Sequence, residues 1–167
     1  MATEKQDVIA AAIRLEQDGR QFYLDAAAGS DSTLAQETFQ ALADDELRHI
    51  EYIRQISAGD DSLQTVNQRV YQRLRGIFAD VSDDVREAVA SASRDIEALD
   101  LAMEREEQSR VAYEQWREQA ETEELRSLCE LLEGAELFHR QLLENVIEYL
   151  EHPSDFFLRE ERWIVEG

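Results

Sequence analysis

A glutamate followed three positions later by a histidine occurs twice in this chain, at two places that are 90 residues apart. The first copy is Glu46 with His49, and the second is Glu136 with His139. Residues three apart lie on the same face of a helix, so each copy presents a carboxylate and an imidazole together. The repeat predicts two helices of the same kind, one in each half of a duplicated chain.

Another pair of glutamates and a pair of tyrosines keep the same 90-residue offset. Glu16 and Glu106 each lie 30 residues before the glutamate of a Glu-x-x-His motif. Tyr23 and Tyr113 each follow those glutamates by seven residues. Each half therefore carries one lone glutamate and one Glu-x-x-His motif. Together these are the ligand set of a carboxylate-bridged two-metal site in a four-helix bundle.

Apolar residues recur at helical spacing in four long stretches. We expect helices over about 5–28, 32–58, 83–120 and 122–151. The connection 59–82 is long enough to run the length of a bundle, which predicts a crossover between the second and third helices. The expected fold is an all-α, ferritin-like four-helix bundle. We expect a single domain over 1–167, with duplicated halves at about 5–58 and 94–151 and a short tail at 152–167.

Charge and cysteine content exclude several classes of function. The formal net charge is −21, which argues against binding nucleic acid or an anionic membrane, since both require Lys and Arg. We expect a cytoplasmic protein, because the chain shows neither a signal peptide nor an apolar run that could span a membrane. Cys129 is the single cysteine, so no Cys-x-x-Cys motif is present to hold zinc, rubredoxin-type iron or an iron–sulfur cluster.

The repeated residues suit a pair of divalent metal ions. Fe(II) and Mn(II) bind carboxylate oxygens well, and imidazole also suits iron. Two such ions bring four positive charges, which four glutamates balance. We predict that Glu46 and Glu136 bridge the two ions. The other four residues form two terminal sets, Glu16 with His49 and Glu106 with His139.

The alternative for the motif is a solvated ion pair, since a single Glu-x-x-His is common in an acidic chain. Metal binding is favoured because two of the three histidines occupy the motif and both copies lie on an apolar stripe. Tyr23 and Tyr113 have three interpretations: a hydrogen bond to a ligand carboxylate, an electron relay, or a core tyrosine satisfied locally.

The residues around the motifs resemble the diiron domain of rubrerythrins over about 5–150. The segment Ala102-Met103-Glu104-Arg105-Glu106, followed by Ala112-Tyr113 and Glu136-x-x-His139, is similar to the second half of that domain. Leu15-Glu16 with Gly19, Phe22-Tyr23 and Asp45-Glu46-x-x-His49 is similar to the first half. The resemblance implies two iron ions that react with hydrogen peroxide or oxygen, with manganese or a mixed pair left open.

The chain departs from the rubrerythrin pattern in two respects. Typical rubrerythrins carry a rubredoxin domain with four cysteines, so the resemblance implies an external electron-donor protein here. They also have an extra ligand glutamate one turn after the lone glutamate of the third helix. That position is Ser109 in this chain, and Gly19 in the first half. The resulting set of four glutamates and two histidines is closer to bacterioferritin.

Four functions follow as alternatives. The leading one is a cytoplasmic diiron oxidoreductase that reduces hydrogen peroxide or oxygen, working as a homodimer or small homo-oligomer. The second is a ferroxidase of the bacterioferritin type, which oxidises Fe(II) for storage or delivery. The third is a hydroxylase of an organic substrate. The fourth is a metal-free helical scaffold whose acidic face binds partners.

Overall fold

The structure, a computed structural model, describes residues 2–59 and 85–152, and the side chains of 5–59 and 94–152. Four helices make up this part of the chain, and they form the predicted all-α four-helix bundle. Each helix begins and ends within three residues of its predicted bounds. The helices are α1 (Ala2–Gly29), α2 (Thr33–Ser57), α4 (Val85–Gln119) and α5 (Glu123–Glu151).

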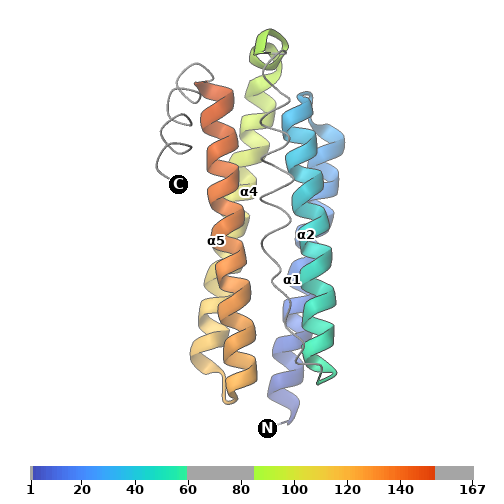
Figure 1. Cartoon of the computed structure of the whole chain (residues 1–167), viewed down its shortest axis with the longest axis vertical. Coiled ribbons are helices and arrows are strands. Elements are labelled where there is room, and N and C mark those ends of the chain that lie inside the picture. Colours follow the sequence, from blue (N-terminus) through green and yellow to red (C-terminus); the bar gives the residue numbers. More distant parts are fainter. Residues whose placement is uncertain (1, 60–84, 153–167) are drawn as a thin grey trace, which may run out of the picture.

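The helices form two antiparallel hairpins, α1 with α2 and α4 with α5 (Figure 1). In Figure 1, α2 ends at the lower end of the bundle, whereas α4 begins at the upper end. Arg94 of α4 accordingly contacts Asp31, just before α2, at 2.7 Å. Helices α2 and α4 are therefore parallel, as in a bundle with a crossover. The predicted crossover at 59–82 lies outside the described residues apart from Gly59, and the predicted tail lies outside them after His152.

Polar side chains define where the helices begin. Ser32 caps α2 and Thr122 caps α5, each accepting a hydrogen bond from the backbone N–H three residues later. The two caps are 90 positions apart, as expected for a duplication. Asp95 of α4 accepts hydrogen bonds from the backbone N–H groups of Asp31 (3.1 Å) and Ser32 (2.9 Å). The α1–α2 turn is thus fixed to the other hairpin.

The apolar core is divided into two clusters by a layer of ionisable side chains. One cluster lies near the α1–α2 turn and includes Phe39 and Leu143. The other lies near the α4–α5 turn and includes Ile53 and Leu132. Burial of each such side chain stabilises the fold by about 1.5–3 kcal/mol. Within the described ranges, no helix is both long enough and apolar enough to cross a membrane.

Candidate metal centre

All six predicted ligand residues lie in the ionisable layer between the two apolar clusters. They come from all four helices, and none is more than 2% exposed. Burying so many ionisable groups is costly unless they are paired or bind a metal. The residues are Glu16 on α1, Glu46 and His49 on α2, Glu106 on α4, and Glu136 and His139 on α5.

The six residues form two overlapping groups of four. Within each group, one oxygen or nitrogen atom from every residue lies within 4.8 Å of the others. The groups are Glu16, Glu46, His49 and Glu136, and Glu46, Glu106, Glu136 and His139. Glu46 and Glu136 belong to both groups, which is the placement that bridging carboxylates require. Their role as metal bridges stays a prediction.

Both histidines direct Nδ1 toward the carboxylates of the glutamates in the site. His49 Nδ1 lies 3.0 Å from Glu16 Oε2 and 3.2 Å from Glu46 Oε2. His139 Nδ1 lies 3.4 Å from Glu106 Oε2 and 3.8 Å from Glu46 Oε1. The two imidazole rings stack with their centroids 5.3 Å apart. Each terminal glutamate is thus next to the histidine that the sequence assigned to it.

Two buried atoms support a cation in the group that contains Glu106 and His139. Among the described residues, His139 Nδ1 and Glu106 Oε2 have no hydrogen-bond partner, although they lie only 3.4 Å apart. A buried polar atom without a partner costs about 1–3 kcal/mol. A cation between the two atoms would remove that cost. The set of four carboxylates and two imidazoles suits Fe(II) or Mn(II), so the residues fit a pair of divalent ions.

The two repeated tyrosines hydrogen-bond to predicted ligand carboxylates across the two halves of the chain. Tyr23 donates its hydroxyl to Oε1 of Glu106, and Tyr113 donates to Oε1 of Glu16. This geometry matches the predicted hydrogen bond to a ligand carboxylate and differs from a hydroxyl satisfied locally. Burial and the nearby glutamate charges raise both tyrosine pKa values well above 10. Both hydroxyls therefore remain donors at neutral pH.

Without metal, the two carboxylates of the first hairpin titrate at different pH values. Burial alone would raise the pKa of Glu16, but a hydrogen bond from Glu46 and the charge of His49 lower it to about 2. Burial and the Glu16 charge raise the pKa of Glu46 well above its usual value. The terminal glutamate is therefore ionised at neutral pH, whereas the predicted bridge keeps its proton to a higher pH than an ordinary glutamate.

The second hairpin repeats this division. The pKa of Glu136 is raised by burial and by the charge of Glu106. The pKa of Glu106 is lowered, because contacts with Glu136 and His139 outweigh the effect of burial. Burial opposes protonation of both histidines, yet the adjacent terminal glutamates raise the pKa of His49 to about 10 and also raise that of His139. Bound metal would replace the protons that these groups carry.

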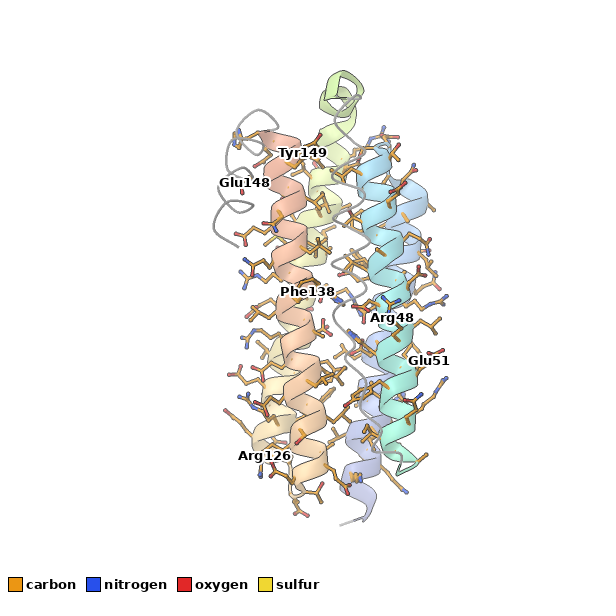
Figure 2. The ribbon with its side chains drawn as sticks, in the orientation of Figure 1. Arg48, Glu51, Arg126, Phe138, Glu148 and Tyr149 are labelled. Carbon is orange, nitrogen blue, oxygen red and sulfur yellow. The ribbon has the colours of Figure 1, made fainter. Side chains whose placement is uncertain are left out.

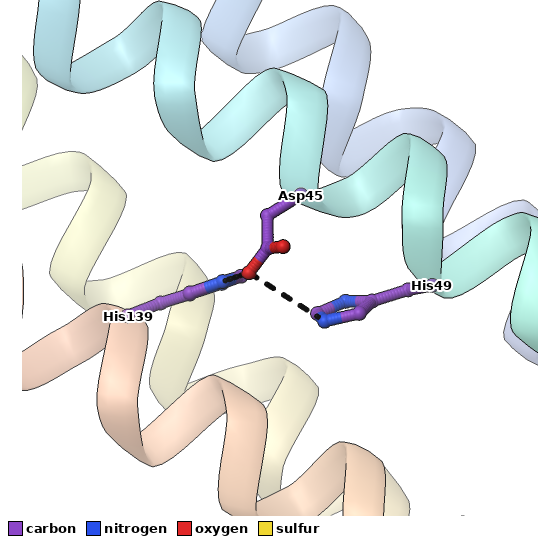
Figure 3. A group of neighbouring side chains, drawn as sticks. All are labelled: Asp45, His49 and His139. Carbon is purple, nitrogen blue, oxygen red and sulfur yellow. Dashed lines mark hydrogen bonds and ion pairs between the residues drawn. The ribbon is translucent and has the colours of Figure 1, made fainter. Parts of the chain in front are cut away.

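The structure adds Asp45, which the sequence reasoning missed. Asp45 lies beside His139 (Figure 3), with Oδ2 2.8 Å from His139 Nε2. Asp45 Oδ1 accepts a hydrogen bond from Arg48 Nε at 2.9 Å. Burial would raise the Asp45 pKa, but the hydrogen bond from His139 and its charge lower it to about 2. Asp45 is not part of the 90-residue repeat, because position 135 holds alanine. The only feature of the sequence that could have indicated Asp45 is its position next to Glu46.

The two positions that lack the extra rubrerythrin glutamate are both buried beside the site. A Cβ atom added at Gly19 would lie 3.0 Å from Arg105 Nη2 and 3.2 Å from Glu46 Oε1. The Arg105 guanidinium crosses from α4 to α1, where it donates to the Leu15 carbonyl at 2.9 Å. The missing side chain of Gly19 therefore leaves space for the side chains of Arg105 and Glu46 to lie against α1. Ser109 is 6% exposed and offers no carboxylate at the equivalent position of α4.

Comparison with family models relates the chain to a known family. The family model described as Rubrerythrin matches residues 7–96, which is more than half of the chain. The matched range contains Glu16, Glu46 and His49, while the three ligand candidates of the second hairpin lie beyond it. Neither the curated proteins nor the solved structures give a significant match.

Proposed function

The chain belongs to the rubrerythrin family, and we propose that it is a non-haem diiron oxidoreductase that reduces hydrogen peroxide or oxygen. One observation carries the proposal: Glu46 and Glu136 are shared by two groups of four potential ligand residues. A shared pair of carboxylates is what a two-metal site needs in a helical bundle. The two groups would each hold one iron ion.

The protein's own residues hold and neutralise the pair. Four glutamates offset four positive charges, and the Tyr23 and Tyr113 hydroxyls restrain Glu106 and Glu16. The ligand side chains are almost completely buried, so bulk water is excluded. A bound iron pair would supply Lewis acidity and two electrons, one from each ion, which is the number needed to reduce hydrogen peroxide to two waters.

A separate protein is the proposed source of electrons. A rubredoxin-type iron site needs four cysteines, and this sequence contains only Cys129. Cys129 is buried, and burial raises the pKa of its thiol to about 11. A protonated, buried thiol is a poor redox residue. We therefore expect repeated turnover only when an external donor is added.

Stopped-flow oxidation of the Fe(II)-loaded protein tests the reaction. We expect one equivalent of hydrogen peroxide to oxidise both ions, at least as fast as oxygen does. The reaction should then stop until a reductant is supplied. Glu136→Ala, which removes a shared carboxylate, serves as the metal-deficient control. Oxidation by oxygen but not by hydrogen peroxide would contradict the peroxidase activity and leave only the reduction of oxygen.

A ferroxidase of the bacterioferritin type is the second candidate. The observation that favours it is the absence of a carboxylate at Gly19 and Ser109, which leaves four glutamates and two histidines in the described site. A storage ferroxidase would take up many irons per site, form a mineral and elute as a large shell. We expect a homodimer or small homo-oligomer instead. Preference for oxygen together with a shell-sized particle in size-exclusion chromatography would favour the ferroxidase.

A further inference from the structure

We infer that the two metal positions are not equivalent, and that the position formed by Glu106 and His139 binds metal more tightly and fills first. The inference rests on the proposed two-metal centre. The two positions differ because Asp45 is a positioning residue for His139. The described residues provide no such positioning residue for His49.

The contacts of the two Nε2 atoms differ. Asp45 Oδ2 lies 2.8 Å from His139 Nε2 but 3.8 Å from His49 Nε2. Figure 3 shows Asp45 of α2 with the two imidazole rings. Only the shorter distance is a hydrogen bond. Among the described residues, His49 Nε2 is buried and has no hydrogen-bond partner. Arg48 holds the Asp45 carboxylate in place through contacts of 2.7 and 2.9 Å.

The duplication explains why His49 lacks the contact. Asp45 reaches from the first half to His139 in the second, so the equivalent contact to His49 would come from position 135. That position holds alanine, which is fully buried. The position equivalent to Arg48 holds Phe138, and the two residues lie at about the same level on α2 and α5 (Figure 2). One half has therefore kept an Asp–Arg pair where the other half has apolar residues.

A hydrogen bond at Nε2 affects metal binding at Nδ1. A neutral imidazole has one N–H and one lone pair, so an acceptor at Nε2 fixes the proton there and leaves Nδ1 free for the metal. Such a contact also fixes the ring orientation and raises the basicity of the ligand atom. Removing it typically lowers metal affinity by about 10- to 100-fold. We expect a difference of this size between the two positions.

Asp45, His49 and His139 also lie close enough to form a metal group of their own. Binding at that group would use both Nε2 lone pairs. Each Nδ1 would then carry a hydrogen, and neither could bind a metal beside the glutamates. The six-residue centre and the three-residue group therefore use opposite tautomers, which can be distinguished experimentally.

Nitrogen NMR of the histidines, with Zn(II) as a diamagnetic probe, tests the inference without using activity. The protein has a mass of 19.3 kDa and only three histidines, so few resonances have to be assigned. The exposed His152 serves as an internal reference. Zn(II) would be added to ¹⁵N-histidine-labelled, metal-free protein in steps below one equivalent. We expect the Nδ1 resonance of His139 to report binding first, and that of His49 to respond only near the second equivalent.

Two variants make the two halves alike and should abolish the order of filling. Asp45→Ala places alanine at both position 45 and position 135. We expect the metal affinity at His139 to fall by about 10- to 100-fold, to the affinity at His49. Ala135→Asp gives aspartate at both positions, and should raise the His49 affinity. Circular dichroism checks that each variant folds. If Ala135→Asp does not fold, Asp45→Ala alone is sufficient to test the inference.

Three outcomes would overturn the inference. Equal filling of the two histidines in the unmodified protein would refute the inequivalence while leaving the two-metal centre intact. Binding through both Nε2 atoms would place the ion at Asp45 instead. Binding at neither histidine would refute this inference and the proposed function together.

Discussion

Tyr113 of α4 donates its hydroxyl to Glu16 of α1, so the two residues join opposite halves of the duplicated chain. Tyr23 forms the equivalent bond to Glu106. Each tyrosine thus restrains the terminal glutamate of the half to which it does not belong. The two halves of the site are therefore connected by hydrogen bonds even before a metal binds.

A double-mutant cycle on the metal-free protein tests this crossed arrangement. Tyr113→Phe removes the hydroxyl that donates to Oε1 of Glu16, while His49 Nδ1 still lies 3.0 Å from Oε2. We expect Tyr113→Phe and Glu16→Gln to be coupled by about 1–3 kcal/mol in the free energy of unfolding, measured in urea. The matched control pairs Tyr113→Phe with Glu106→Gln, which should show weaker coupling. Stronger coupling to Glu106 would contradict the crossed hydrogen bonds.

The bridging assignment predicts different metal contents for two single variants. Glu136→Ala removes a carboxylate shared by both groups, so we expect almost no bound metal. Glu16→Ala removes a terminal ligand, so about one ion per chain should remain, compared with about two in the unmodified protein. Elemental analysis of each purified variant gives the ratio. The exposed Glu130→Ala on α5 is the control, and equal losses from Glu16→Ala and Glu136→Ala would contradict the assignment.

The stability of the metal-free protein should decrease as pH rises from 5 to 9. The folded-state pKa values of Glu46 and Glu136 are raised, so the folded protein binds more protons than the unfolded chain above about pH 4.5. Each proton kept only in the folded state decreases the free energy of unfolding by at most about 1.4 kcal/mol per pH unit. The contribution of His49 acts in the same direction. It is fully present below about pH 6.5 and is lost as pH rises through about 10.

Urea unfolding at pH 5, 7 and 9 measures this dependence. The double variant Glu46→Gln/Glu136→Gln keeps the surface charge but cannot titrate at the two bridges, so its stability should vary less with pH. Saturating metal should reverse the trend, because the metal replaces the protons. A metal-free protein that is more stable at pH 7 than at pH 5 would refute the buried, protonated bridges.

Two glycine substitutions separate helix propensity from contacts at the site. Gly134 lies within α5, and a Cβ atom added there meets nothing within 4 Å. Gly134→Ala should therefore stabilise the fold by about 0.5–1 kcal/mol. Gly19→Ala should not show that gain, because its Cβ atom would crowd Arg105 and Glu46. We also expect weaker metal binding for Gly19→Ala only, measured by Zn(II) titration; unchanged binding would show that Glu46 adjusts freely.

Repetition in the sequence was sufficient to predict the four-helix bundle and to identify six residues that lie close together in its ionisable layer. The apolar stripes located four helices, because bundle cores impose a helical period on the sequence. The offset between Glu16 and Glu106 identified them even though each is a single glutamate in an acidic chain. Both lie in the ionisable layer, next to the assigned histidines.

Features that occur in one half only, or that depend on packing across halves, could not be predicted in this way. Asp45 has no repeated partner, so the offset gave no signal for it. Tyr23 lies seven residues after Glu16 on the same helix, yet its hydroxyl reaches Glu106, because helix packing decides which carboxylate is closest. The contact of Arg105 with the Leu15 carbonyl likewise depends on how closely α1 approaches α4.

The division of the bundle into two hairpins has a consequence for its assembly. Each group of four contains three residues from one hairpin and one shared glutamate from the other. A single hairpin can therefore complete neither group. Metal would act as a reversible cross-link between segments that are about 90 residues apart in the chain. Two separately expressed hairpins should accordingly associate more tightly when metal is supplied, and chelation should weaken their association again.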